Sequence, residues 1–195
     1  LCESETARRE LKRLYGIDGK VVPQPLRKEF VEPRRSEGVE GSGITRFLFV
    51  GQDVARKGIQ DVREAFLRLP ASARLKSELT VITGGKSAAE IAELMRTHDV
   101  FVLPSYGDTG PTAIKEALAM GMPVIAYDNT GPKELLEKYG GTLVKTGDVC
   151  ALAVAMEKSL AISHRALGIA ERVRRDLSRE IVWKELLKVY EGVIR

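Results

Sequence analysis

Apolar residues along the chain form short continuous runs, separated by segments in which they recur every three or four positions. The runs RFLFVG, LTVITGG, VFVLPS, PVIAY and GTLV have the length of strands. The spacing of Ile59, Val62, Phe66 and Leu69 predicts a helix that ends at Pro70. Because these strands alternate with helices and lack an apolar–polar alternation, we predict an α/β domain. Its Rossmann-like parallel sheet would carry helices on both faces.

Further helices are predicted on both sides of these strands and at the chain ends. SETARRELKRLYG predicts a helix with a capping box in the turn Ser4–Arg9 and an end at Gly16, followed by an extended segment, KVVPQPLRKEF. Other predicted helices are SAAEIAELMRTH, Pro111–Met120, Val149–Leu160, Ser163–Leu177 and the terminal SREIVWKELLKVYEGVI. On the last of these, Trp183 and Tyr190 are interpreted as packing anchors.

Composition narrows the class of protein. The 195 residues are 44% hydrophobic, enough for one full domain and a fragment of another, and the start at Leu1 suggests a piece of a longer protein. A net charge of +4 is spread along the chain and aromatics make up only 6%, so we expect no nucleic-acid partner. An anionic small molecule or an acidic membrane surface suits this charge equally well.

Cysteine and histidine are too few to build a disulfide framework or a metal site. The two cysteines and the two histidines lie far apart in the sequence, so we expect a reducing cytoplasm, no metal and no other cofactor. No apolar run approaches the roughly 18 residues of a membrane-spanning helix. If the protein contacts a membrane, we therefore expect this contact to be peripheral.

Three loops are candidate binding segments, because ligands of open parallel sheets bind beyond the carboxyl ends of the strands. They are GQDVARKG, TGGKSA and PSYGDTGPT. The third loop contains Asp108 and leads into a helix opened by Pro111, whose start can hold phosphate. Glu116 in that helix could accept hydrogen bonds from two sugar hydroxyls, or could be a solvated acid near the helix start.

The basic residues of the first loop have two interpretations as well. Lys57, with Arg56, can reach the same crevice and pair with a diphosphate, or the two can be ordinary surface cations. TGGKS lacks the first glycine of a phosphate-binding P-loop, because Thr80 stands in its place.

Taken together, three stretches resemble the C-terminal domain of glycosyltransferase family 4. They are FLFVGQDVARKGIQDVREAF, HDVFVLPSYGDTGPTAIKEALAMGMPVIAYDNTGPKELL and GGTLVKTGD, in that order. The resemblance implies the donor-binding half of a retaining, nucleotide-sugar-dependent enzyme with the GT-B fold. It divides the chain into an interdomain helix and linker (1–43), a donor-binding domain (44–177) and a crossing helix (178–195). The partners it implies are a nucleoside-diphosphate sugar and an N-terminal domain of the same protein.

The resemblance also assigns roles to particular residues. The family's two acids separated by seven residues fall on Asp108 and Glu116, so Glu116 would hold the ribose and Asp108 would lie near the donor sugar. Lys57 matches the family's lysine that contacts the donor diphosphate. Lys57 and Asp108 are therefore the two candidate catalytic residues. Further candidate substrate-binding residues are Gly51, Gln52, Arg56, Gly110 and Thr112.

Several positions depart from the family pattern. Asp108 is one methylene shorter than the usual Glu, Gln52 stands where Arg is frequent, and Gly110-Pro111 replaces Phe-Gly. One strand–helix unit is missing before HDVFVLPS. These departures leave a second hypothesis open, a nucleotide-sugar-binding or scaffolding domain without catalysis.

Overall fold

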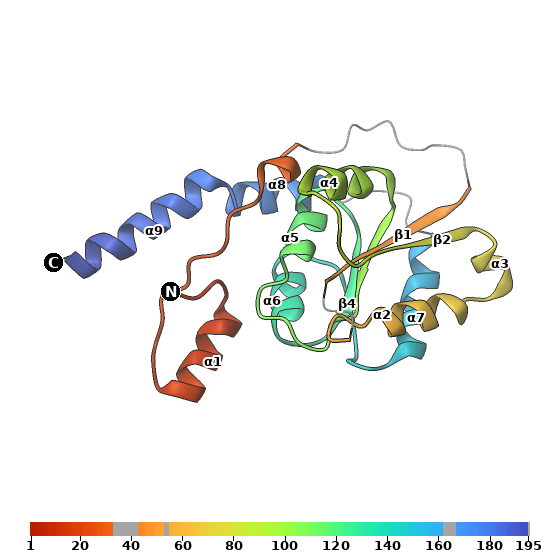
Figure 1. Cartoon of the computed structure of the whole chain (residues 1–195), viewed down its shortest axis with the longest axis horizontal. Coiled ribbons are helices and arrows are strands. Elements are labelled where there is room, and N and C mark those ends of the chain that lie inside the picture. Colours follow the sequence, from red (N-terminus) through yellow and green to blue (C-terminus); the bar gives the residue numbers. More distant parts are fainter. Residues whose placement is uncertain (33–42, 53–54, 162–166, 195) are drawn as a thin grey trace.

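A five-stranded parallel sheet forms the centre of the molecule (Figure 1). The computed structural model describes residues 1–32, 43–52, 55–161 and 167–194. The strand order is β2-β1-β3-β4-β5. The strands are β1 (Thr45–Val50), β2 (Ser77–Ile82), β3 (Val100–Leu103), β4 (Val124–Tyr127) and β5 (Thr142–Val144). The five apolar runs therefore predicted the strands and the parallel sheet correctly.

Helices cover both faces of the sheet, as the alternating pattern predicted. Figure 1 shows α2 (Ile59–Leu67) and α7 (Val149–Ser159) on one side of the strands, and α5 (Thr112–Ala119) and α6 (Thr130–Tyr139) on the other. The other helices between β1 and α9 are α3 (Ala71–Arg74), which follows α2, α4 (Ala88–Thr97), which follows β2, and α8 (Leu167–Asp176), which follows α7. Helix α2 packs against α7, and α5 packs against α8, so both layers are continuous.

Burial of the strands depends on their position in the sheet. Every residue of β3 and β4 is buried, because these strands have neighbours on both sides and helices on both faces. The two edge strands are less buried than the central strands: in β2 only Ser77 is buried, and in β5 only Val144. β2 is an edge strand, and its outer side lacks the cover that a neighbouring strand would give.

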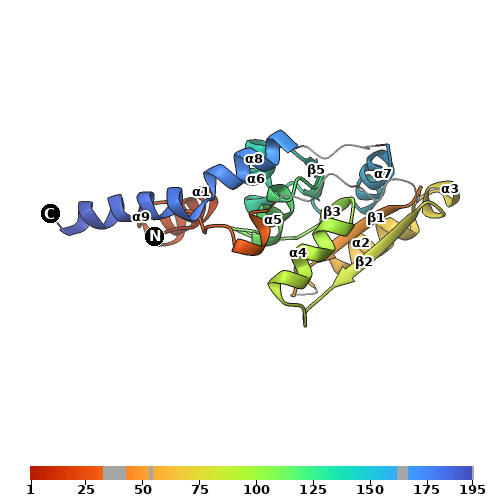
Figure 2. The ribbon, with the colours of Figure 1, turned by 90° about the horizontal axis from the view of Figure 1, so that it is seen from above.

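The two ends of the chain extend to the same side of this body. In Figures 1 and 2, α1 (Glu5–Tyr15) and α9 (Arg179–Ile194) both lie beyond α5 and α6, away from the sheet. The interpretation of Trp183 and Tyr190 as packing anchors is wrong for the described chain, because these side chains are 57% and 54% exposed. Helix α9 projects from the body, so among the stripe residues whose burial the structure describes, only Val182, near the start of the helix, is buried.

Local hydrogen bonds correct several details of the predicted helices. Ser4 caps α1 by accepting from the Ala7 amide, and α1 ends at Gly16 in the left-handed region, but the reciprocal bond of a capping box occurs at Ser87 and Glu90 of α4 instead. The segment predicted as extended after α1 contains a 3-10 turn, η1 (Lys28–Phe30). Helices α3 and α6 were not predicted, because α3 is only one turn long and α6 contains few apolar residues.

Parts of three predicted segments lie outside the described residues. These are residues 33–42 of the predicted linker, residues 53–54 of the loop GQDVARKG and residues 162–166 at the start of the helix predicted over Ser163–Leu177. The division of the chain into three segments at 43 and 177 stays a prediction. Within the described ranges, no helix is long and apolar enough to cross a membrane.

Candidate functional site

Lys57 and Asp108 meet at the carboxyl ends of β1 and β3, although 51 positions separate them in the sequence. The Lys57 ammonium donates a hydrogen bond to Oδ2 of Asp108, and both side chains are mostly buried. Strands β1 and β3 are neighbours in the sheet, so the loops that follow them start side by side. The predicted candidate catalytic pair is therefore assembled in space.

Gly58 makes this close approach of the two loops feasible. Its φ of +73° is left-handed, and a β-carbon at this position would overlap the carbonyl oxygen of Pro104. Glycine is the residue that fits both conditions. The backbone after Lys57 thus packs directly on the chain that leads from β3 to Asp108.

Helix α2 is tied to the same loop by a tyrosine pair. The Asp61 carboxylate of α2 accepts hydrogen bonds from the hydroxyls of Tyr106 (2.6 Å) and Tyr127 (2.5 Å). The two rings pack edge to face at 5.6 Å. Tyr106 lies two residues before Asp108, so this network supports the loop from the side of α2.

Asp108 is also held from α6. Its carbonyl accepts from the Gly131 amide (2.7 Å) and from the Thr130 hydroxyl (2.8 Å), and its Oδ1 accepts from the Gly110 amide at 3.3 Å. A side chain at Gly131 would collide with the Asp108 carbonyl. The backbone of Asp108 is thus held by α6, and its carboxylate is held by the Gly110 amide and by Lys57.

Glu116 lies in α5 and is only 2% exposed. Its Oε1 accepts a hydrogen bond from Nε of Arg27 at 2.6 Å, and the guanidinium of Arg27 also stacks over the Phe30 ring. Burial raises the pKa of Glu116 above its usual value, although the bond from Arg27 acts in the opposite direction. The same bond raises the pKa of Arg27. Arg27 thus covers the carboxylate that the sequence predicts to bind ribose, a pairing that sequence reasoning missed.

Thr112 and Arg56, two other predicted substrate-binding residues, each form a hydrogen bond to a neighbouring segment. Thr112 donates to Oε1 of Gln24 at 3.0 Å, so the segment before η1 contacts the start of α5 as well. Arg56 donates to the Gly107 carbonyl at 2.7 Å, which places its guanidinium on the Asp108 loop. Gly51 is buried at the end of β1, and Gln52 is exposed.

Gly110 lies under the N-terminal segment. A β-carbon at Gly110 would overlap the carboxylate of Glu3, and the Ser4 hydroxyl donates to the Thr109 carbonyl at 2.6 Å. The turn before α5 is therefore covered by the N-terminal segment.

Sequence reasoning also missed Lys115. It precedes Glu116 in α5, and its side chain is 4% exposed, with no hydrogen-bond partner for Nζ among the described residues. Burial lowers its pKa. The available signal was a lysine inside AIKEALAM, a stretch that is apolar apart from Lys115 and Glu116, since a charged residue there must either reach solvent or be buried.

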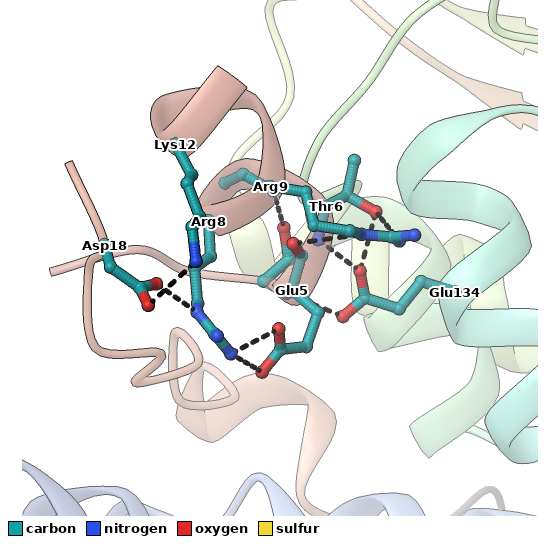
Figure 3. A network of polar contacts seen from close by, with 9 residues as sticks. Glu5, Thr6, Arg8, Arg9, Lys12, Asp18 and Glu134 are labelled. Atoms are coloured by element: carbon teal, nitrogen blue, oxygen red, sulfur yellow. Dashed lines mark hydrogen bonds and ion pairs between the residues drawn. The ribbon is translucent and has the colours of Figure 1, made fainter. Parts of the chain in front are cut away.

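The N-terminal segment is fixed on α6 by Glu134 (Figure 3). The Glu134 carboxylate accepts from the backbone amides of Glu5 (3.0 Å) and Thr6 (2.8 Å), and from the Thr6 hydroxyl at 2.7 Å. These are the unpaired groups at the start of α1, where a carboxylate is favoured. Arg8 links Glu5 to Asp18 in the same network.

Chemically, the assembled residues suit an anionic ligand. Lys57 supplies a cation beside the start of α5, whose first amides have no partner within the helix. Pro111 occupies the N-cap position of this helix without a capping side-chain hydrogen bond, and it lacks an amide hydrogen. Among the described residues, no group of three or more His, Cys, Asp or Glu side chains is placed to hold a metal ion.

In a comparison with known protein families, residues 67–176 match the family model described as "Glycosyl transferases group 1". The "Putative teichuronic acid biosynthesis glycosyltransferase TuaC" of Bacillus subtilis is 30% identical, over 81% of this chain and 46% of its own length. A "GDP-mannose-dependent alpha-mannosyltransferase" of Mycobacterium tuberculosis is 31% identical, over 96% of this chain and 47% of its own. The chain spans about half the length of these two relatives.

Solved structures show the same architecture. A sucrose-phosphate synthase from Thermosynechococcus elongatus aligns with 99% of this chain and 57% of its own, with a TM-score of 0.80 and 21% identity. WaaG, a glycosyltransferase involved in lipopolysaccharide biosynthesis, aligns with 93% of this chain and 59% of its own, with a TM-score of 0.74 and 17% identity. The parallel sheet and its helices therefore have the Rossmann-like architecture of GT-B glycosyltransferases.

Proposed function

The chain belongs to the group 1 glycosyl transferases, and from this premise we propose that it is the donor-binding half of a retaining hexosyltransferase. In the whole protein, an N-terminal domain would hold the acceptor on the other side of the cleft. The sugar would come from a nucleoside diphosphate sugar bound at the carboxyl ends of β1 and β3. That the chain spans about half of its relatives supports this division of labour.

The meeting of Lys57 and Asp108 beside the start of α5 is the observation that carries this proposal. A diphosphate placed there would contact the Lys57 ammonium and the first amides of the helix. Asp108 would face the transferred sugar. Glu116, one turn into α5, would hold the ribose after Arg27 moves aside.

In this scheme the domain acts on the leaving group. Breaking the bond between sugar and phosphate leaves negative charge on the nucleoside diphosphate. Lys57 and the helix start stabilise that charge in a preorganised site, and such stabilisation is usually the largest single contribution to catalysis. Configuration at the anomeric carbon would be retained.

The proposal is tested by titrating the 195-residue chain with GDP, UDP and ADP in a calorimeter. We expect saturable binding of a nucleoside diphosphate, and we place GDP first because two relatives, 31% and 38% identical, are named as GDP-mannose-dependent. We expect no glycosyl transfer by this chain alone. Binding of none of the three would contradict the proposal, and transfer by the chain alone would contradict the role of a separate acceptor domain.

Replacing Lys57 with alanine should weaken the binding of that nucleoside diphosphate by about 1.5–3 kcal/mol, the range for hydrogen bonds to charged groups. Calorimetry measures the loss. Lys76→Ala is the matched control, because Lys76 is an exposed lysine that precedes β2 at the opposite end of the sheet. Equal affinities of both variants and the wild type would contradict the diphosphate role and leave Lys57 as the ion-pair partner of Asp108 alone.

A further inference from the structure

A cavity of about 590 Å³ opens between the N-terminal segment, the turn after Asp108, α6 and the start of α9. Its volume lies in the range of small-molecule sites, roughly 300–1,000 Å³. The turn contributes Thr109 and Gly110 to its lining, whereas Lys57, Asp108 and Glu116 are not among the lining residues. It is therefore a separate pocket beside the proposed donor site.

Lys115 lines this cavity and gives it its chemical character. Its ammonium is buried without a hydrogen-bond partner among the described residues, and such groups in folded proteins normally have one. A ligand that enters the cavity and offers an acceptor oxygen would supply that partner. The acceptor could belong to an anion, to a hydroxyl group or to water, and occupancy by water alone would appear in the titration below as an absence of saturable sugar binding.

The acidic lining decides against an anion. Five carboxyl side chains line the cavity, against two lysines, Lys115 and Lys138; the acids are Glu3, Glu5, Glu134, Asp176 and Glu185. A phosphate or carboxylate ligand would add to this negative charge, and a cation would leave Lys115 without an acceptor. Hydroxyl groups satisfy both sides, because each one can accept from an ammonium and donate to a carboxylate.

Part of the cavity lining, its apolar wall, consists of hydrophobic residues. Leu135, Leu177 and Ile181 line it, together with Val21 and Pro23 from the N-terminal segment. A small-molecule site typically combines apolar surface with a few convergent polar groups that fix orientation. The carbon–hydrogen face of a pyranose ring would lie on this wall while its hydroxyls reach Lys115 and Glu3.

We propose that this cavity is a binding site for an uncharged hexose unit, oriented by hydrogen bonds from Lys115 and to Glu3. The site needs no nucleotide. It would therefore bind sugar even if the proposed role of Lys57 and Glu116 proves wrong.

The pKa of Lys115 provides a supporting readout that does not depend on the sugar. Burial lowers this pKa below 10.5. Without a ligand, the charged Lys115 side chain therefore destabilises the folded protein at neutral pH. Lys115→Met keeps a similar length without the charge and should raise the melting temperature by a few degrees. Because the penalty disappears as the pH approaches 10.5, the difference between variant and wild type should shrink in that direction.

The decisive experiment follows backbone amide signals of the 195-residue chain by NMR during titration with D-mannose, D-glucose, N-acetyl-D-glucosamine and inorganic phosphate. We expect at least one sugar to shift Gly110, Gly131 and Leu135 saturably, with phosphate inactive. Lys115→Met should lower the affinity for that sugar by about tenfold or more. Lys86→Met, at an exposed lysine outside the cavity, should leave it unchanged.

A second variant guards against a trivial loss of folding. Ile181→Asp places a charge on the apolar wall at a position that is 37% exposed, so the fold should survive while sugar binding falls. Absence of saturable sugar binding, equal binding by wild type and Lys115→Met, or a preference for phosphate would each overturn the proposal.

Discussion

Replacing Gly58 with alanine should lower the free energy of unfolding by about 3–5 kcal/mol. About 1–2 kcal/mol of this arises because an L-residue is strained at a φ of +73°. The larger part arises because the new β-carbon would overlap the Pro104 carbonyl, and that backbone atom cannot move without displacing the end of β3. Urea unfolding measures the loss.

Gly85 offers a control in which only the strain is present. Its φ is +72°, but no atom lies within 4 Å of the position that a β-carbon would occupy. Gly85→Ala should therefore cost only about 1–2 kcal/mol. Gly58→Ala should also weaken nucleoside diphosphate binding, since Lys57 and Asp108 would be pushed apart. Equal losses of stability in the two variants would show that the packing of Gly58 on Pro104 does not hold these loops together.

Replacing Arg27 with methionine should cost about 2–3 kcal/mol of stability at pH 7. The change leaves the Glu116 carboxylate buried without its ion-pair partner. The carboxyl can escape this penalty by binding a proton. For a group with an unfolded pKa of 4.5, neutralisation costs about 1.4 kcal/mol for each pH unit above that value, which sets an upper limit.

The pH dependence follows from this limit. The pKa of Glu116 is already raised by burial and would rise further without Arg27, so the folded variant holds a proton that the unfolded chain releases. The variant therefore loses stability as pH rises above 4.5, and its deficit should be less than about 1 kcal/mol at pH 5. Melting curves of variant and wild type at pH 5 and pH 7 measure this difference.

Two controls separate the buried charge from other effects of the substitution. Arg13→Met removes an ion pair of similar length, 2.7 Å, but Glu10 there is 43% exposed, so the cost should be below about 1 kcal/mol. The double variant Arg27→Met/Glu116→Met removes both charges and should recover most of the loss. A deficit that is the same at both pH values would contradict the account.

How far the sequence predicts this molecule depends on how local each signal is. The runs that form β3 and β4 are apolar throughout, because both strands are buried on all sides, and this pattern is visible without a structure. The meeting of Lys57 and Asp108 was predictable too, since both residues follow parallel strands and ligands bind beyond the carboxyl ends of such strands.

Contacts across the fold gave no such signal. Arg27 and Glu116 are 89 positions apart, and neither residue type announces a partner, so their pairing follows only from the path of the segment before η1. Trp183 shows the opposite error. An aromatic residue on an amphipathic helix favours packing, but α9 projects from the described body and leaves that side chain exposed.

The central claim is that Glu116 is the ribose ligand of a nucleotide-sugar-binding site. The most direct measurement is a double-mutant cycle that combines wild type and Glu116→Gln with GDP and 2′-deoxy-GDP, or with the corresponding pair for whichever nucleotide binds best. A carboxylate can accept from both ribose hydroxyls, whereas glutamine puts an amide donor in place of one acceptor. Melting curves would check that the variant is folded.

Such a cycle isolates the coupling between the Glu116 carboxylate and the 2′-hydroxyl. We predict a coupling free energy of roughly 1–2 kcal/mol, with the ribonucleotide weakened much more than its deoxy analogue. A coupling free energy of zero within error would contradict the claim and leave Glu116 with the single role of anchoring Arg27.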